Sequence, residues 1–394
     1  MKYDFDQIID RKHAEGSYSS KWADNGVGAF NAFGDQPYPE DRLSLFLADM
    51  DFKTAPPVIA AMQKVLDHGL MGYSRAPKEY APAVEGWFDR RFGWKVDPSW
   101  IRIHRGAHNA IKDILPHISE PGDGVIVLQP TYFFRSDVVS CGRHYVGVRM
   151  NNDEGFYTIN WEKLEEAMRE PTNTFMIMEQ PHNPTGRIWT VEEIKKIGEL
   201  AKKYGITLIS DEVHMDISRK GEKVEPLMKV LGPEKLITIT GVNKTFNLAG
   251  LAMTNVVIGD EDIKAKLGPS RNSASPFGIA AVIAAYTQCD DWVDALNEYL
   301  DKLIDHIIGR LHAELPEIKV RKPDGTYVLW LDFSGFGLTD DQVNERLQLR
   351  AHLAMSDGRT MDTFPGEQYR RWCATCPISV ADEAIDRLVK AFKG

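Results

Sequence analysis

Long apolar runs, cysteine and an excess of positive charge are all scarce in this sequence. No uninterrupted apolar run approaches the roughly 18 residues that a membrane helix requires, and the first residues contain no apolar segment typical of a signal peptide. The formal net charge of −10, from 47 Lys and Arg against 57 Asp and Glu, argues against nucleic acid or an anionic membrane as a partner. We therefore expect a soluble, cytoplasmic protein that acts on a small molecule.

Cysteine is too rare for a disulfide framework, with four residues in a chain of 394. Cys373 and Cys376 have the CxxC spacing of redox and zinc sites, but a second CxxC pair is absent, which excludes a four-cysteine zinc site. No strand-to-helix context typical of a redox site surrounds the pair. We expect both cysteines to be small buried residues and predict no metal site.

The length of the chain exceeds what one hydrophobic core usually supports, so we expect two domains with a cleft at their interface. Short, apolar and β-branched segments are typical of strands that are buried on both faces. Such segments lie at 124–130, 174–180, 206–212, 236–241 and 254–259.

A helix start is recognisable between the second and third of these strands. Thr190 and Glu193 have the spacing of a capping box, and apolar residues follow at helical intervals. Repetition of strand and helix over 46–285 predicts a large α/β domain with a mostly parallel sheet, whose ligand crevice lies beyond the carboxyl ends of the strands. Residues 286–394, with a further strand candidate in GTYVLWLDF, predict a smaller α+β domain, and 1–45 predict an N-terminal arm that also contributes to it.

Polar residues follow the predicted strands where that crevice is expected. In chain order they are Tyr132, Asn183, Asp211 with His214, and Lys244. A cofactor with a phosphate, a ring nitrogen, a phenolic oxygen and an aldehyde needs a partner for each group, and this set can supply them.

Lys244 and Asp211 are unusual at the ends of buried strands, because an unpaired buried charge costs several kcal/mol. An imine at Lys244 and a protonated ring nitrogen beside Asp211 remove both problems. The alternative is a simple ion pair between Lys244 and Asp211, or surface positions misread as buried.

Several strings of this sequence, in order, resemble the fold-type I pyridoxal-phosphate (PLP) enzymes of the class I/II aminotransferase superfamily. The resemblance is to the branch of cystathionine β-lyases and cystalysin-like C–S lyases. The strings are LADMDF at 47–52, GYSRAPKEY at 72–80, PHNPTGR at 181–187, SDEVHMD at 210–216 and KTFNLAG at 244–250. This resemblance spans nearly the whole chain and implies a seven-stranded sheet in the large domain, PLP as cofactor and an amino acid as substrate.

The resemblance also implies roles for individual residues. Lys244 would carry PLP as a Schiff base and then act as acid and base at the substrate Cα, and Asp211 would hold the ring nitrogen. Asn183 and His214 would contact the phenolic oxygen, and Tyr132 would stack on the ring, unless it is an ordinary core residue.

The phosphate is expected at RGAHNA, where the backbone N–H groups of Gly106, Ala107 and His108 open a predicted helix. A zinc site at His104 and His108 is disfavoured because there is no HExxH motif. Tyr73 resembles the tyrosine that this family sends across a homodimer interface to the neighbouring phosphate.

Two residues are implied to bind the substrate. Arg371 resembles the arginine that pairs with the substrate α-carboxylate, and counting back from Pro377 favours it over Arg370. A solvated surface arginine is the alternative. Ala48, in LADMDF, is the second implied substrate contact.

The sequence departs from this branch in four places: Phe133 stands where a second tyrosine is common, Asn243 replaces a serine, and the strings RGAHNA and 356–368 differ. These departures leave the predicted cofactor site intact, but the identity of the substrate stays open. We expect C–S β-elimination. Transamination uses the same groups and remains the alternative, and a non-catalytic PLP-binding regulatory scaffold is a third hypothesis.

Overall fold

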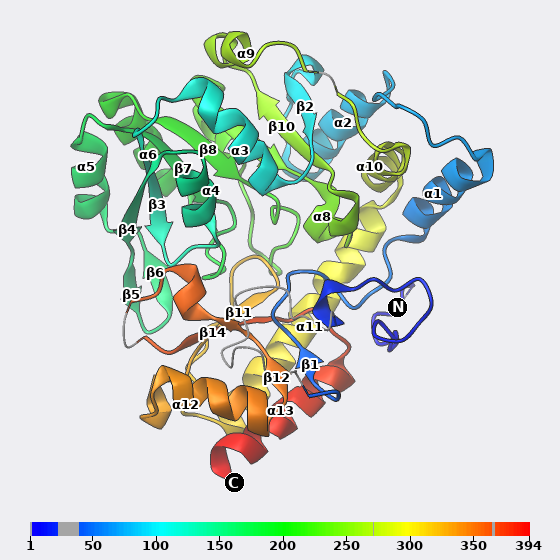
Figure 1. The fold of residues 1–394 in the computed structure, drawn as a ribbon, viewed down its shortest axis with the longest axis vertical. Helices are drawn as coiled ribbons and strands as arrows, with labels where there is room; N and C mark the ends of the chain where they lie inside the picture. The colour runs from blue at the N-terminus through cyan, green and yellow to red at the C-terminus, as the bar shows by residue number, and fades with distance from the viewer. Residues whose placement is uncertain (1, 23–38, 271, 365–366) are drawn as a thin grey trace.

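The computed structural model describes residues 2–22, 39–270, 272–364 and 367–394, and Figure 1 shows their arrangement. Much of the predicted N-terminal arm, residues 23–38, and part of the divergent stretch 356–368 lie outside the described residues. In the part of the chain that is described, no helix combines the length and the apolar character needed to cross a membrane.

A seven-stranded sheet forms the upper part of the molecule in Figure 1, with the strand order β2-β10-β9-β8-β7-β3-β4. Its strands are β2 (Ile101–His104), β3 (Gly124–Gln129), β4 (His144–Arg149), β7 (Asn173–Glu179), β8 (Thr207–Asp211), β9 (Leu236–Thr240) and β10 (Thr254–Ile258). All five predicted strands are present, and the α/β class is confirmed. The pairs among β4, β3, β7, β8 and β9 are parallel, but β10 is antiparallel to both of its neighbours. Composition does not reveal this direction, because any strand buried on both faces is apolar throughout.

Helices cover both faces of this sheet, and successive strand residues pack on opposite sides. Val125 and Val127 join one apolar cluster with α3, α4 and α9, whereas Ile126 and Leu128 join the main core with α5, α6 and α7. The helices are α1 (Pro56–His68), α2 (Tyr80–Phe92), α3 (Ala107–Ile118), α4 (Phe134–Ser140), α5 (Trp161–Arg169), α6 (Val191–Tyr204), α7 (Leu227–Leu231), α8 (Val242–Thr245), α9 (Glu261–Leu267), α10 (Pro276–Gln288), α11 (Asp290–Glu314), α12 (Asp340–Glu345) and α13 (Ile378–Lys393). The predicted capping box starts α6: Thr190 Oγ1 accepts from the Glu193 N–H, and the Glu193 carboxylate accepts from the Thr190 N–H.

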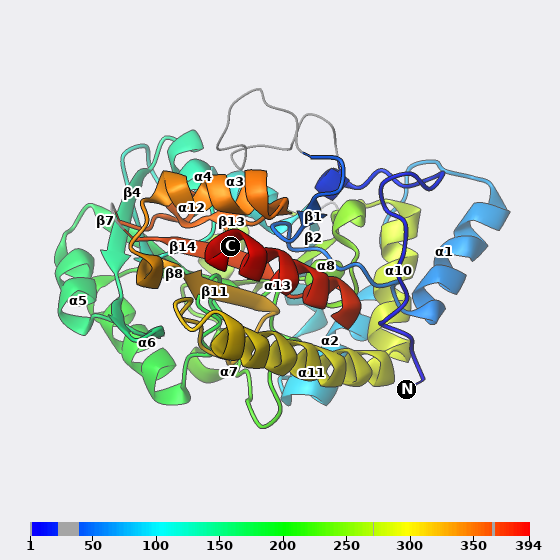
Figure 2. The same cartoon turned by 90° about the horizontal axis from the view of Figure 1, so that it is seen from below.

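A second, antiparallel sheet of order β11-β14-β13 lies below the first in Figure 1. Helices α11 and α13 pack against each other beside it, as the view from below shows (Figure 2). The remaining strands are β1 (Leu43–Ser44), β5 (Asn151–Asp153), β6 (Phe156–Thr158), β11 (Val328–Asp332), β12 (Leu353–Ala354), β13 (Ser356–Asp357) and β14 (Tyr369–Cys373). β1 pairs with β12, so residues near the N-terminus join the C-terminal part of the fold. The domain boundaries at residues 45 and 285 stay a prediction.

Candidate active site

Most of the predicted site residues line one cavity of about 200 Å³ beyond the carboxyl ends of the parallel strands. The predicted residues on its wall are Ala107, His108, Tyr132, Asn183, Asp211, His214 and Lys244. They come from segments that are up to 137 positions apart, counting from residue 107 to residue 244. The structure therefore brings together what the sequence separates, as expected where parallel strands end at one edge.

Lys244 does not end a strand, as the sequence suggested, but lies in the short helix α8, which begins two residues after β9. The side chain is half-buried, and its Nζ donates to the Ala48 carbonyl oxygen at 3.0 Å. The alternative of an ion pair with Asp211 is wrong, because no such contact joins these two described residues. The amine is instead held at the cavity wall by a neutral acceptor.

Asp211 ends β8 and is buried, with the Val213 N–H donating to its Oδ1 at 3.2 Å. Burial raises the pKa of this carboxyl above its ordinary value, while His108 and Lys244 act in the opposite direction. A buried carboxylate without a cation in contact is suited to a protonated ring nitrogen, which would supply a charge-assisted hydrogen bond.

Arg371 lies in β14 and is almost completely buried at 1% exposure. Its Nη1 donates to Asn183 Oδ1 at 3.2 Å and its Nη2 to the Phe46 carbonyl at 2.8 Å, while its Nε has no partner among the described residues. The guanidinium also lies 4.6 Å from the centre of the Tyr132 ring. Arg371 can therefore offer an unused edge to a carboxylate.

Arg370, the neighbouring candidate, points to the other side of the strand. It donates to Asn344 Oδ1 at 2.9 Å and pairs with Asp340 at 3.0 Å. The pleat of β14 alternates its side chains, so only one of the two arginines can face Asn183.

His214 is buried, and its Nδ1 has no hydrogen-bond partner in the described structure. Burial lowers the pKa of this imidazole well below its ordinary value, and the positive charges of Lys244 and Arg371 lower it further. The ring is therefore neutral, and its edge packs against Tyr327 at a centroid distance of 5.3 Å. A neutral ring with an open nitrogen can hydrogen-bond a cofactor oxygen.

The start of α3 provides open backbone donors at another wall of the cavity. Gly106 precedes the helix with φ 89°, and no side chain caps the N–H groups that follow at Ala107 and His108. Uncapped N–H groups at a helix start attract anions such as phosphate. The His108 ring itself turns to Asp137, with which its Nδ1 forms a hydrogen bond.

Tyr73, Ala48 and Arg371 lie outside the set of residues that line this cavity, although Arg371 contacts two of its lining residues, Asn183 and Tyr132. Tyr73 is fully exposed and lines a separate depression with Arg105 and Ser275. Ala48 reaches the site through its carbonyl oxygen, which accepts from both Lys244 and Tyr327.

Two residues at which the sequence departs from the resembled branch also lie close to the site. Phe133, at φ 54°, packs edge-on against Tyr132 with ring centres 4.6 Å apart. Asn243 lines the cavity and donates to Thr254 Oγ1 at 3.4 Å, leaving its own Oδ1 without a partner.

Glu179 lines the cavity as well and was missed from the sequence. It ends β7, is paired in register with Asp211 on β8, and is 4% exposed. Its Oε1 accepts from Thr131 at 3.3 Å, while its Oε2 faces His182 Nε2 at 3.4 Å without a hydrogen bond. Burial, and then the neighbouring Asp211, raise the pKa of Glu179 well above its ordinary value. The signal that singled out Asp211, an acid at the end of a buried strand, could have found Glu179.

The two cysteines of the CxxC spacing are free and buried. Burial raises the pKa of both thiols, that of Cys376 to about 12. The Cys373 thiol donates to the Phe46 carbonyl at 3.5 Å. Both groups are therefore neutral, which does not favour a redox or metal site.

The cavity has a partner for each polar group of PLP. Asp211 is suited to the ring nitrogen, Asn183 and His214 to the phenolic oxygen, the start of α3 to the phosphate and Lys244 to the aldehyde. The residues present thus fit the cofactor.

Comparisons with known proteins agree with this fit. Residues 44–389 match the family described as aminotransferase class I and II. The chain is 34% identical to cystathionine β-lyase PatB of Bacillus subtilis over 97% of this chain and 98% of that protein. It is 27% identical to an aspartate aminotransferase of Pyrococcus horikoshii, over 90% and 92% of the two chains.

A solved structure supports the same assignment. Cystalysin from Treponema denticola, which contains PLP, superposes with a TM-score of 0.91 and 30% identity over 100% of this chain and 99% of that chain. The cofactor of the present protein is PLP, as in this neighbour. The chain belongs to the class I and II aminotransferase family of fold-type I PLP enzymes.

Proposed function

We propose that this protein is a PLP-dependent C–S β-lyase that cleaves L-cystathionine or a related cysteine thioether. With water, cystathionine would give homocysteine, pyruvate and ammonia. The observation that carries the proposal is the full-length similarity to a cystathionine β-lyase in a chain whose Lys244, Asp211 and Asn183 line one cavity.

Lys244 holds the cofactor covalently and moves protons. When bound, PLP withdraws electrons from the substrate and so acidifies its Cα proton. Once the substrate amine has displaced Lys244 from the cofactor, the freed Lys244 amine removes that proton. Its position beside the neutral Ala48 carbonyl, rather than in an ion pair, leaves the amine free for this work.

Four side chains hold the cofactor ring. Asp211 keeps the ring nitrogen protonated, since its buried carboxylate has no competing cation in contact. Asn183 and His214 bind the phenolic oxygen, and Tyr132 stacks on the ring. The start of α3, at Ala107 and His108, binds the phosphate through backbone N–H groups.

The active unit is a homodimer. Leu70, Met71 and Tyr73 form a strongly exposed, largely apolar segment after α1, which is suited to burial against a second copy. In that dimer the partner's Tyr73 contacts the phosphate.

Arg371 binds the substrate α-carboxylate in a two-point contact, and the segment around Ala48 closes that end of the site. Each terminal nitrogen of Arg371 makes one hydrogen bond to protein and retains a second hydrogen, and Nε is free. The carboxylate is thereby held at a fixed orientation relative to Lys244.

Release of pyruvate and thiol without a 2-oxo acid tests this function. Purified holoenzyme is mixed with L-cystathionine, and pyruvate is followed with lactate dehydrogenase while thiol is followed with a disulfide reagent. Equimolar pyruvate and thiol are expected, with none from the Lys244→Ala variant. Product formation that depends strictly on an added 2-oxo acid would assign the protein to the aminotransferases.

Transamination is the second candidate, since the aspartate aminotransferase of Pyrococcus horikoshii is similar over 90% of this chain. The third hypothesis, a non-catalytic regulatory scaffold, predicts a cofactor whose visible spectrum does not respond to amino acids. A spectral change on adding substrate, accompanied by turnover, contradicts it.

A further inference from the structure

Residues 46–52, here called the carbonyl loop, contact the two groups of the site that bind substrate and cofactor. The Phe46 carbonyl accepts from Arg371 Nη2 at 2.8 Å. The Ala48 carbonyl accepts from Lys244 Nζ at 3.0 Å and from the Tyr327 hydroxyl at 3.0 Å. The position of this loop therefore affects both Arg371 and Lys244.

The loop is anchored to the segment that carries the lysine. Asn247, three residues after Lys244, accepts from the Met50 N–H at 2.9 Å and donates to the carbonyls of Met50 and Phe52 at 2.7 and 3.0 Å. A displacement of the loop is thus transmitted directly to the segment of Lys244.

The loop is also anchored to the segment that follows β14, the strand of Arg371. The Thr375 hydroxyl donates to the Asp49 carbonyl at 2.9 Å, and the Asp51 N–H donates to the Thr375 carbonyl at 2.8 Å. These contacts tie the loop to the segment after β14 as well as to the segment that carries Lys244.

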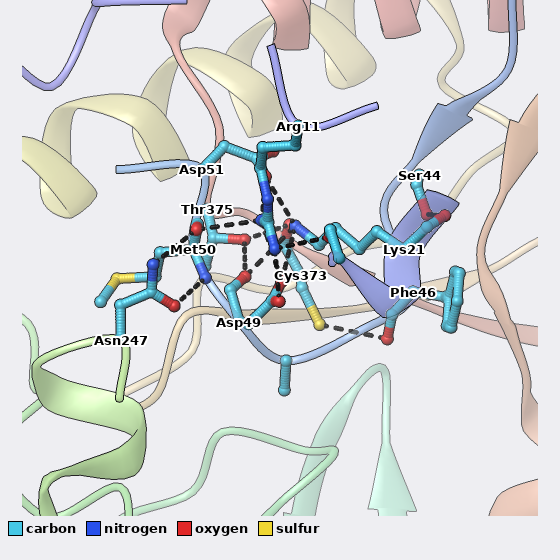
Figure 3. Close-up of polar contacts among 12 residues, drawn as sticks. Arg11, Lys21, Ser44, Phe46, Asp49, Met50, Asp51, Asn247, Cys373 and Thr375 are labelled. Atoms are coloured by element: carbon cyan, nitrogen blue, oxygen red, sulfur yellow. Dashed lines mark hydrogen bonds and ion pairs between the residues drawn. The ribbon is translucent and has the colours of Figure 1, made fainter. Parts of the chain in front are cut away.

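The other side of the loop is held by a cluster of four charges, Arg11, Lys21, Asp49 and Asp51, which we call the charge cluster (Figure 3). Lys21 Nζ lies 3.1 Å from a carboxylate oxygen of each aspartate. Arg11 contacts Asp49 at 2.6 Å, Asp51 at 2.5 Å and the Met50 carbonyl at 3.1 Å. The two cations come from the N-terminal segment, and the two anions belong to the loop.

Lys21 is the most deeply buried member, at 1% exposure. Burial opposes its charge, but Asp51 and Asp49 outweigh it, so the pKa of Lys21 lies above its ordinary value. The cluster is neutral, with two cations for two anions, and loss of one cation leaves a half-buried carboxylate unbalanced. The loop position shown here therefore depends on both basic residues.

We propose that Arg11 and Lys21 are positioning residues, through which the N-terminal segment sets the carbonyl loop and thereby orients Arg371 and Lys244. Neither residue lines the cavity; both act through Asp49 and Asp51, and Arg11 also acts through the Met50 carbonyl. The inference rests on the proposed roles of Arg371 and Lys244, but not on whether the reaction is elimination or transamination.

The test replaces Lys21 with methionine, an unbranched side chain one atom shorter than lysine, which removes the charge. The probe is glycine, which has a carboxylate for Arg371 and an amine for the cofactor, and its binding is followed by the visible absorption of the holoenzyme. The apparent Kd for glycine should rise about tenfold, the effect of weakening one charge-assisted hydrogen bond. Lys12→Met, in the same segment but with its amine on the Glu40 carbonyl, is the matched control and should leave Kd unchanged.

A second variant guards against loss of folding. Lys21→Met combined with Asp51→Asn keeps the cluster neutral, so it should melt at a higher temperature than the single variant and still bind glycine more weakly than wild type. A wild-type Kd for glycine in every folded Lys21 variant overturns the proposal and shows that the cluster serves stability alone. Wild-type enzyme that responds to glycine but releases no thiol from cystathionine overturns the C–S lyase function and leaves this inference intact.

Discussion

Replacing Arg371 with lysine should lower kcat/KM without unfolding the protein. The guanidinium is 1% exposed, with Nη1 on Asn183 and Nη2 on the Phe46 carbonyl. Lysine keeps the positive charge but cannot hold both of these groups and make a two-point contact with a carboxylate. At least one charge-assisted hydrogen bond is lost, a contribution of about 1.5 to 3 kcal/mol. At about 1.4 kcal/mol for each factor of ten, kcat/KM should fall roughly 10- to 150-fold.

The assay is steady-state release of pyruvate from L-cystathionine over a range of concentrations. KM should carry most of the change, because the carboxylate is bound before and during the chemical step. Arg370→Lys is the matched control: it makes the same replacement one residue away, on the face of β14 that contacts Asp340 and Asn344. It should lower the melting temperature and leave KM unchanged. A loss below about threefold for Arg371→Lys, or an equal loss for Arg370→Lys, would refute the reasoning.

Three further predictions address the dimer, the buried acid and the fold. The Tyr73→Ala and Lys244→Ala variants should each be inactive alone. When their subunits are mixed and exchanged, half of the dimers contain one intact site out of two, so about a quarter of the wild-type activity should return. No recovery of activity contradicts a site shared between subunits. Because folding raises the pKa of Glu179, the stability of the wild type falls as the pH rises above the ordinary carboxyl pKa. The Glu179→Gln variant has no such proton to lose, so its melting temperature relative to wild type should increase between about pH 5 and 8. A constant difference in melting temperature contradicts a proton held by Glu179. Thr190→Ala removes the acceptor of the Glu193 N–H and should cost about 1 kcal/mol of unfolding free energy while kcat stays unchanged.

The agreement between sequence and structure is best where a local pattern has one physical cause. The strands at 124–130 and 174–180 are apolar along most of their length because helices cover both of their faces, and the capping box at Thr190 depends on residues three positions apart. Sequence and structure disagree where contacts between residues far apart in the chain determine the local structure. The direction of β10 and the short helix under Lys244 depend on their neighbours in the fold, which no local pattern records.

The sequence alone determined the α/β class, because strand and helix periodicity is local. It also determined the cofactor and most of the residues that line one cavity, because polar residues follow the strands and the ordered motifs resemble a PLP family. The sequence favoured Arg371 over Arg370, and the tertiary structure shows that Arg371 is the one that contacts Asn183. Only the tertiary structure decided that a second buried acid, Glu179, stands beside Asp211 and that Lys21 reaches Asp49 and Asp51 from the N-terminal segment. These features depend on the pleat of β14, on strand register and on contacts between segments far apart in the chain. Such relations arise only when the chain is folded, since hydrogen bonds and charges act over a few ångströms in space and not along the sequence.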